Sequence, residues 1–147
     1  MHEKKGRPCQ LSLGVASANV LTLGGGDTGF VGKTHYLQDQ FATHGFAMVG
    51  IQEARSKEGL IVGKGPYYRF CSGHQSGHHG VELWISKSQP VGYVGQRPVL
   101  INRPDVTVLW KDPRRLLVHI ETEIFAFYVV VLHCPQSGQD LESRESW

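Results

Sequence analysis

Three polar residues stand directly after apolar, strand-like segments. Asn19 follows SLGVASA, Glu53 follows FAMVGIQ, and His133 follows FYVVVL. The amide oxygen of Asn19 is a hard ligand that suits Mg²⁺, and its NH₂ group can bind a phosphate oxygen. A carboxylate such as Glu53 is the usual protein anchor for Mg²⁺. A histidine at position 133 can orient a phosphate or shuttle a proton. These residue types suit chemistry on a phosphate group assisted by a divalent cation.

Each of the three residues also has an ordinary structural interpretation. Asn19 can cap a turn before the glycine run that follows it. Glu53 can be a solvated acid in a loop, and His133 can be a structural histidine. Their shared position at strand ends favours a site, since open α/β sheets place ligands at the carboxyl ends of their strands. We therefore expect the three side chains to converge at one end of a sheet.

Short apolar segments separated by glycine and proline must position these residues. Residues 125–133 are nearly all apolar, which predicts a central strand covered on both faces. A further short strand is expected in the Gly/Pro-rich connection between residues 86 and 106. The first expected strand lies within residues 11–23. The others are expected at residues 46–52, 67–71, 81–86, 106–110, 115–122 and 125–133.

One clear helix is expected, over residues 31–44. Leu37 and Phe41 stand four residues apart in it, and Gly45 occupies the position of a C-terminal glycine cap. A strand, a helix and a second strand in this order indicate an α/β unit. Residues 139–147 are typical of the start of another helix. The pattern predicts an α/β (α+β) fold in which β-structure predominates.

Composition limits the class of protein. The 147 residues fit one domain, with a polar tail over 1–10 and the domain over 11–147. A net charge of +2 does not by itself indicate nucleic-acid binding, and it does not exclude it. The odd number of cysteines argues against a disulfide framework and favours a reducing compartment. No segment is typical of a signal peptide or a membrane span, so we expect an intracellular, cytoplasmic or nuclear protein that is not secreted.

Several segments resemble, in order, motifs of the endonuclease/exonuclease/phosphatase (deoxyribonuclease-I-like) family. SANVLTLGGG resembles its T-x-N-[VI] strand, and FAMVGIQEAR resembles its D-I-[VIL]-x-L-Q-E-[TV]-[RK] segment. GHHGVELWISK is similar to its G-x-G-G-V-A-[IL] strand. RRLLVHIET and FYVVVLHCPQSG are similar to its R-x-[LI]-x-[VA] and [VI]-x-[NV]-x-[HY]-x-P strands. The resemblance covers roughly residues 11–147, and the quoted segments are most similar to those of the nuclease domains of non-LTR retrotransposons.

The resemblance implies a four-layered α/β sandwich that cleaves phosphodiesters or phosphomonoesters with Mg²⁺ or Mn²⁺. It implies that Glu53 binds the metal, that Asn19 contacts the metal or the phosphate, and that His133 acts in catalysis. The partner would be nucleic acid or another phosphoester. The loop that carries His78 and His79 would lie near the site, where these histidines would touch substrate. Arg55, two residues after Glu53, would be a cation at the edge of the site.

The resemblance also implies that this chain is a truncated domain. The family's G-D-[FL]-N and S-D-H motifs follow the HCP segment, and neither occurs before Trp147. The chain would then hold mostly the first β-sheet, without the second sheet and the general base. An uncovered sheet face would make it associate with other molecules. The alternative interpretation is a non-catalytic remnant, or a protein-interaction module, of the same fold.

A second kind of metal site is suggested by the spacing of Cys71, His74 and His78. Their Cys-x2-His-x3-His pattern is close to that of zinc ligands, but a structural zinc site needs four ligands and no fourth is evident. The ordinary interpretation is a Gly/Ser-rich loop. A zinc-binding β domain therefore stays as a third hypothesis.

Other residues lie in strands or turns. Glu82 is expected to face outward from its strand, with a site histidine as its alternative partner. Trp84 and Trp110 are expected in the core. A small basic cluster could be a solvated turn or a contact to a phosphate backbone. Its members are Lys111, Arg114 and Arg115.

Overall fold

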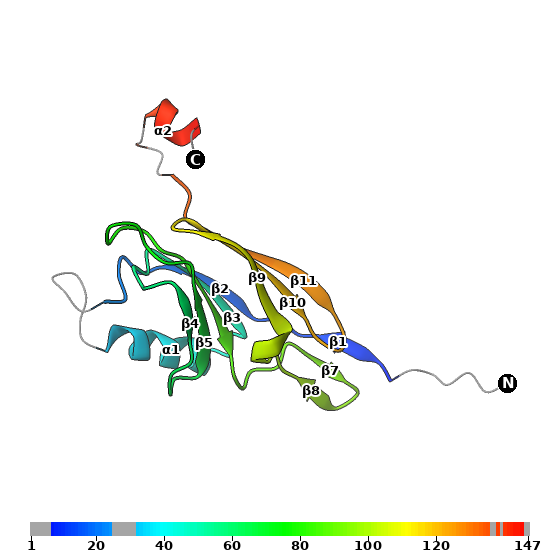
Figure 1. Cartoon of the computed structure of the whole chain (residues 1–147). Coiled ribbons are helices and arrows are strands. Elements are labelled where there is room, and N and C mark those ends of the chain that lie inside the picture. The colour runs from blue at the N-terminus through cyan, green and yellow to red at the C-terminus, as the bar shows by residue number, and fades with distance from the viewer. Residues whose placement is uncertain (1–6, 25–31, 136–137, 139, 146–147) are drawn as a thin grey trace.

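The computed structural model describes residues 7–24, 32–135, 138 and 140–145. Within these residues the chain forms three β-sheets and two α-helices, of which only α1 is longer than two turns (Figure 1). The strands are β1 (Cys9–Leu11), β2 (Val15–Asn19), β3 (Met48–Gln52), β4 (Gly59–Ile61), β5 (Tyr67–Cys71), β6 (Glu82–Ser86), β7 (Gly92–Val94), β8 (Arg97–Val99), β9 (Val106–Asp112), β10 (Arg115–Glu121) and β11 (Ala126–Leu132). The helices are α1 (Lys33–Thr43) and α2 (Leu141–Glu145), with a 3-10 turn, η1, at Arg103–Asp105.

The largest sheet has five strands in the order β2-β3-β6-β5-β4. Strands β2 and β3 are parallel, and α1 forms the crossover between them, as a parallel pair requires. All other neighbours in this sheet are antiparallel. Asn19 lies opposite Gln52 in the register of β2 and β3. The residue after Gln52, which is Glu53, therefore leaves the sheet at the same end as Asn19.

Helix α1 covers one face of the five-stranded sheet. Its expected apolar residues, Leu37 and Phe41, pack against the buried cluster that contains Trp84. The rings of Phe41 and Trp84 meet edge to face, with 6.0 Å between their centroids. Gly45 ends the helix with a φ of 73°, a conformation that glycine adopts without strain. The predicted helix and its glycine cap are confirmed.

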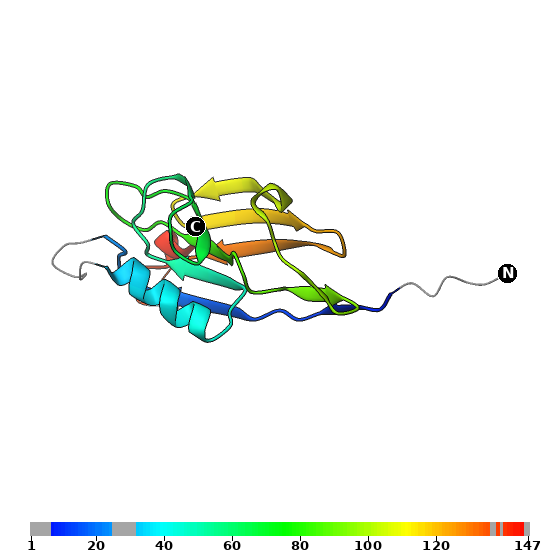
Figure 2. The same cartoon turned by 90° about the horizontal axis from the view of Figure 1, so that it is seen from below.

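A second sheet, in the order β11-β10-β9, covers the other face. Its alternate residues Leu116, Val118 and Ile120 are fully buried, and they join one hydrophobic cluster with Leu83 and Ile85 of the larger sheet. Figures 1 and 2 show α1 and strands β9 to β11 on opposite sides of the five-stranded sheet. The expectation that this face lies uncovered is therefore wrong, because three strands of the chain itself form the covering layer.

Strand β11 lies at the edge of its sheet and is not the central strand expected from its apolar sequence. Its exposure alternates, with Tyr128 66% exposed and Val130 53% exposed while Val131 is buried. The strand is apolar on both faces, but only one face has another layer packed on it. Trp110, expected in the core, lies on the same outer face and is 59% exposed.

A third sheet has the order β1-β7-β8. Strand β1 begins at Cys9, so pairing starts inside the segment expected as a polar tail. Gly92 of β7 lies so close to β1 that a Cβ there would be 2.5 Å from the carbonyl oxygen of Gln10. Two strands, β7 and β8, replace the single short strand expected in this connection, and β4 was not expected.

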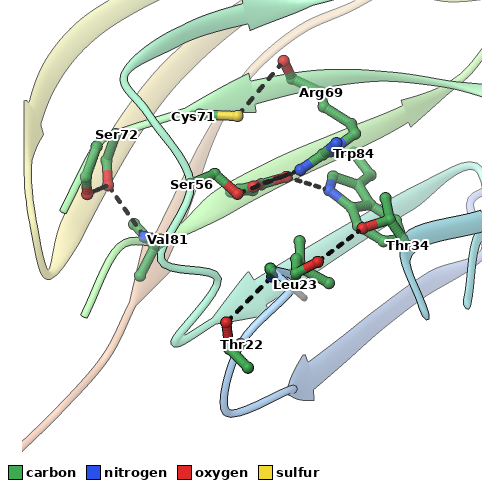
Figure 3. A network of polar contacts seen from close by, with 12 residues as sticks. Thr22, Leu23, Thr34, Ser56, Arg69, Cys71, Ser72, Val81 and Trp84 are labelled. Atoms are coloured by element: carbon green, nitrogen blue, oxygen red, sulfur yellow. Dashed lines mark hydrogen bonds and ion pairs between the residues drawn. The ribbon is translucent and has the colours of Figure 1, made fainter. Parts of the chain in front are cut away.

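Glu82 is fully buried and does not face outward as expected. Its carboxylate accepts two hydrogen bonds of 2.8 Å from the Arg69 guanidinium and one of 2.5 Å from Nε1 of Trp84. The same guanidinium donates to the hydroxyl of Ser56, and Figure 3 shows Arg69 turned toward Trp84 and Ser56. A buried carboxylate is stable here because a bidentate arginine neutralises it. The alternation of side chains along β6 does not by itself reveal that Glu82 is buried. Glu82 points to the face of the sheet that α1 covers.

The fold is thus α+β and mostly β. In the part of the chain that the structure describes, no helix is both long enough and apolar enough to cross a membrane.

Candidate functional site

Asn19, Glu53 and His133 come together at one end of the two packed sheets. The Asn19 amide donates a hydrogen bond of 3.0 Å from Nδ2 to Oε1 of Glu53. The same Oε1 lies 3.3 Å from Nε2 of His133. The side chains of Glu53 and His133 are only 13% and 12% exposed. The predicted convergence of these three residues is confirmed.

Each of the three residues is placed by the end of its strand. Asn19 ends β2, and its Oδ1 accepts the N–H of Leu21 at 3.2 Å, which fixes the orientation of the amide. This turn-capping contact is the ordinary role considered for Asn19, and it leaves Nδ2 directed at Glu53. His133 directly follows β11, and its own N–H donates to the carbonyl of Arg114.

Arg114 and His79 form the other side of the site. Nη2 of Arg114 lies 3.1 Å from Nε2 of His79. Because the guanidinium is always a donor, Nε2 of His79 must accept, and the neutral ring carries its proton on Nδ1. Burial, and next the positive charge of Arg114, lower the pKa of His79 below its ordinary value of 6.5. The His79 and His133 rings are 5.4 Å apart between centroids.

A pocket of about 210 Å³ is lined by Glu53, His79, Arg114 and His133, and Asn19 is not part of its lining. The predicted substrate-binding residues Arg55, His78 and His79 all lie on its wall. Arg114 was expected only as part of a surface cluster, and Cys134 was not singled out. The full lining is Glu53, Arg55, His78, His79, Arg114, His133 and Cys134.

Three residues of the site adopt left-handed backbone conformations. The φ angles are 55° at Glu53, 56° at Arg55 and 62° at His79. Such conformations cost non-glycine residues free energy and persist only where neighbouring structure imposes them. Two backbone hydrogen bonds impose them here, from Ala54 N–H to the Gly80 carbonyl and from Arg55 N–H to the His79 carbonyl, each 2.9 Å long. The loops after β3 and before β6 therefore hold each other in place.

The basic cluster considered in the sequence divides into different contacts. Arg114 faces the pocket, whereas Lys111 pairs with Glu58 and Arg115 donates to Asp112 at 2.6 Å. Of these three residues, only Arg114 lines the pocket.

Among the described residues, Glu53 is the one carboxylate that lines this pocket and could bind a metal there. The hydrogen bond from Asn19 and the 3.3 Å contact with Nε2 of His133 are both made to Oε1 of Glu53, and Oε2 has no hydrogen bond to the described residues. Mg²⁺ is commonly held by one or two carboxylates, with waters and substrate phosphates completing its six ligands. Within residues 7–24, 32–135, 138 and 140–145, no group of three or more His, Cys, Asp or Glu side chains is arranged to hold a metal. The donor set fits a weakly held Mg²⁺ or Mn²⁺ and does not fit a closed site.

Nδ1 of His133 is buried and has no hydrogen-bond partner among the described residues. Since Nε2 faces the Glu53 carboxylate, it is best protonated, which leaves Nδ1 as an unprotonated acceptor. A buried acceptor without a partner is uncommon in folded proteins. The contact of Nε2 with the Glu53 carboxylate thus sets the orientation of the His133 ring on the pocket wall.

The residues of the zinc hypothesis do not converge. Cys71 is buried in β5, its thiol lies 3.9 Å from the carbonyl oxygen of Arg69, and burial raises its pKa. His74 and His78 are exposed in the following turn, where Nδ1 of His74 accepts the N–H of Gly77. A thiol that is buried and protonated is a poor zinc ligand.

Comparison with known proteins adds no assignment. No protein-family model matches the chain. No curated protein is significantly similar to it.

Proposed function

We propose that this chain carries the metal- and phosphate-binding site of a divalent-metal-dependent phosphoesterase that hydrolyses phosphodiester bonds in the manner of a nuclease. Its two packed sheets and α1 would correspond to part of a four-layered α/β sandwich. The observation that carries the proposal is that Asn19 and His133 both contact one oxygen of Glu53. Glu53 and His133 line a pocket that also holds two arginines. Carboxylate, amide, imidazole and guanidinium groups together suit a metal-bound phosphate.

The residues have separate roles in this proposal. Glu53 would hold Mg²⁺ or Mn²⁺ through its carboxylate, and the cation would neutralise charge on the phosphoryl oxygens. Asn19 would orient Glu53 by its hydrogen bond. Arg114 would bind a non-bridging phosphate oxygen, since a guanidinium pairs well with phosphate. His133 would help to position the phosphate from the pocket wall.

The same set of residues also limits the rate of hydrolysis that this chain could reach. The described residues bring one carboxylate to the pocket, and its Oε1 is already engaged by two neighbours. Activation of water needs a further base, because the loss of one member of a cooperating catalytic set removes most of the rate. We therefore propose that the chain by itself binds metal and phosphate without efficient turnover.

The test is a Mg²⁺ titration by calorimetry of the wild-type chain and of Glu53→Gln, repeated with supercoiled plasmid to detect nicking. The matched control is Glu58→Gln, which removes an exposed carboxylate outside this pocket. The proposal expects Mg²⁺ binding that is lost in Glu53→Gln and kept in Glu58→Gln. Nicking that depends on Glu53 would show a more complete catalytic set. Equal binding by all three proteins would contradict the proposal and favour a non-catalytic module of the same fold.

A further inference from the structure

A second, smaller pocket of about 90 Å³ lies between the first two turns of α1, the loop over residues 62–66 and strand β5. We call it the α1 pocket. Its described lining shares no residue with that of the pocket around Glu53. Since a water takes up about 30 Å³ of liquid, the α1 pocket has room for a few waters or for one small ion. Among the residues that the structure describes, no aspartate or glutamate lines it, whereas three basic residues do: His35, Lys64 and Arg69.

Gln38 is a buried polar residue on the wall of the α1 pocket. It lies in the second turn of α1 and is only 4% exposed. Its Oε1 packs so closely on Gly65 that a Cβ at that position would collide with it. The amide of Gln38 has no hydrogen-bond partner among the described residues. A buried amide without a partner is uncommon and costs stability, so its NH₂ group indicates where an acceptor from outside the chain binds.

Arg69 brings a second donor without a partner to the same pocket. Its Nε and Nη2 donate to the buried carboxylate of Glu82, and Nη2 also donates to the hydroxyl of Ser56. Nη1 has no acceptor among the described residues, although the side chain is only 13% exposed. Because the ion pair with Glu82 holds the guanidinium in place, the remaining N–H groups are already oriented for a ligand.

The start of α1 adds positive charge beside these donors. The helix follows Gly32 without a side-chain cap, and its first turn contains no acid. Thr34 and His35 of that turn line the α1 pocket. The amino end of a helix carries a partial positive charge that attracts anions. Lys64, on the opposite wall, is exposed and forms no ion pair with a described residue.

The free polar groups of the α1 pocket are mainly donors, because nearby oxygens are already engaged. The carbonyl of Gly63 accepts a hydrogen bond of 2.6 Å from Nζ of Lys87. The hydroxyl of Tyr67 donates one of 2.7 Å to the carbonyl of Phe46. A water bound here would need acceptors for its own protons, whereas an oxyanion would not. The pocket therefore favours a ligand that only accepts hydrogen bonds.

We propose that the α1 pocket binds a phosphate group. Its donors come from three separate elements, namely α1, β5 and the loop that joins β4 to β5. A phosphate group offers at least three acceptor oxygens to such a set, whereas a carboxylate offers two. The small volume admits the phosphate group and leaves any larger remainder of the ligand outside. This inference does not depend on the proposed phosphoesterase activity.

The experiment is a titration of the whole chain with inorganic phosphate in EDTA, at an ionic strength held constant with sodium chloride. Amide signals are followed by NMR. The side-chain NH₂ signals of Gln38 and the backbone amides of Thr34 and His35 should shift together and saturate with one dissociation constant. A parallel titration with phenyl phosphate distinguishes two sources of the group. Saturable shifts with both ligands assign the pocket to the phosphate end of a larger molecule, and shifts with inorganic phosphate alone assign it to the free ion.

The first pair of variants is Gln38→Leu and Gln40→Leu. Gln38→Leu removes the buried NH₂ group and should weaken phosphate binding about tenfold or more, since a hydrogen bond to a charged group is lost. Gln40 is an exposed residue of the same helix outside the pocket, so Gln40→Leu should stay within about twofold. Because Gln38→Leu also removes a buried amide without a partner, it should not lower the melting temperature in phosphate-free buffer.

The second pair, Lys64→Gln and Lys57→Gln, changes only exposed side chains and does not threaten the fold. Lys64→Gln should weaken phosphate binding about two- to fivefold, because an exposed charge contributes modestly, and Lys57→Gln should leave it unchanged. Absence of saturable shifts at Gln38 would overturn the proposal. Equal phosphate affinity of the wild type, Gln38→Leu and Lys64→Gln would overturn it as well, since the phosphate would then bind elsewhere.

Discussion

Asn19 donates a hydrogen bond of 3.0 Å to the carboxylate of Glu53, although the two residues are 34 positions apart in the sequence. The parallel pairing of β2 with β3 brings them together, because Asn19 and Gln52 are register partners. The amide thus stands against a carboxylate that is only 13% exposed. Under the proposed function, this pair would determine how the site responds to a divalent cation.

Asn19→Asp should make the stability of the fold depend on Mg²⁺. The substitution places a second carboxylate against Glu53, and like charges at this distance disfavour joint ionisation. We expect a loss of about 1–2 kcal/mol in the free energy of unfolding in EDTA, because the hydrogen bond is also replaced by repulsion. Mg²⁺ should restore most of it. Thermal denaturation with and without Mg²⁺ checks this, with Asn19→Ala as control. An equal Mg²⁺ response in both variants would contradict the expectation.

Breaking the Arg69–Glu82 pair should destabilise the fold strongly. Glu82 is fully buried, so Arg69→Met leaves an uncompensated charge and should cost about 3–5 kcal/mol. The double variant Arg69→Met/Glu82→Met should recover most of this loss, because well-packed apolar residues often replace a buried ion pair without cost. Urea unfolding of the three proteins measures the coupling. Additive losses in the double variant would show that the pair does not act as a unit.

Leu116→Ala tests the packing of the second sheet on the first. Leu116 of β10 is fully buried between the sheets, and its truncation should cost about 2–5 kcal/mol. Leu109→Ala in neighbouring β9 is the matched control, since Leu109 is 50% exposed, and should cost less than about 1 kcal/mol. Chemical denaturation distinguishes them. Similar small losses would mean that β9 to β11 do not cover the larger sheet in solution.

His79 should make the protein less stable in mild acid. Its pKa in the fold is lowered below 6.5, first by burial and then by Arg114. Between the two pKa values the unfolded chain binds more protons than the folded one, so stability falls as pH decreases through 6.5 and levels off below the folded pKa. His79→Gln should flatten this dependence in urea unfolding between about pH 5 and pH 8. His35→Gln, an exposed position on α1, should leave it unchanged. A profile for His79→Gln that matches the wild type would refute the assignment.

The sequence predicted most strands, the main helix and the meeting of the three polar residues. These predictions rest on local signals: apolar runs ended by a polar residue, and the spacing of Leu37, Phe41 and Gly45. Local signals do not reveal which face of a strand another layer will cover. That is why Glu82 was expected outside and Trp110 inside, and why β11 was expected at the centre of a sheet.

The sequence predicted only part of the site, for a related reason. Asn19 ends a strand, and Glu53 and His133 directly follow strands, so their convergence follows from sheet geometry. Arg114 lies in the turn between β9 and β10, and the sequence does not show which residue of that turn points inward. Its position becomes clear only from the hydrogen bond between the Arg114 carbonyl and the N–H of His133.

The left-handed backbone at Arg55 has a consequence for the evolution of this protein. A φ of 56° favours glycine, so Arg55→Gly should relieve strain and make the fold slightly more robust to heat. The same change removes a cation from the pocket wall. Selection for thermal robustness alone would therefore discard the arginine. Its retention in any natural variant would mark that position as one kept for binding at the expense of stability.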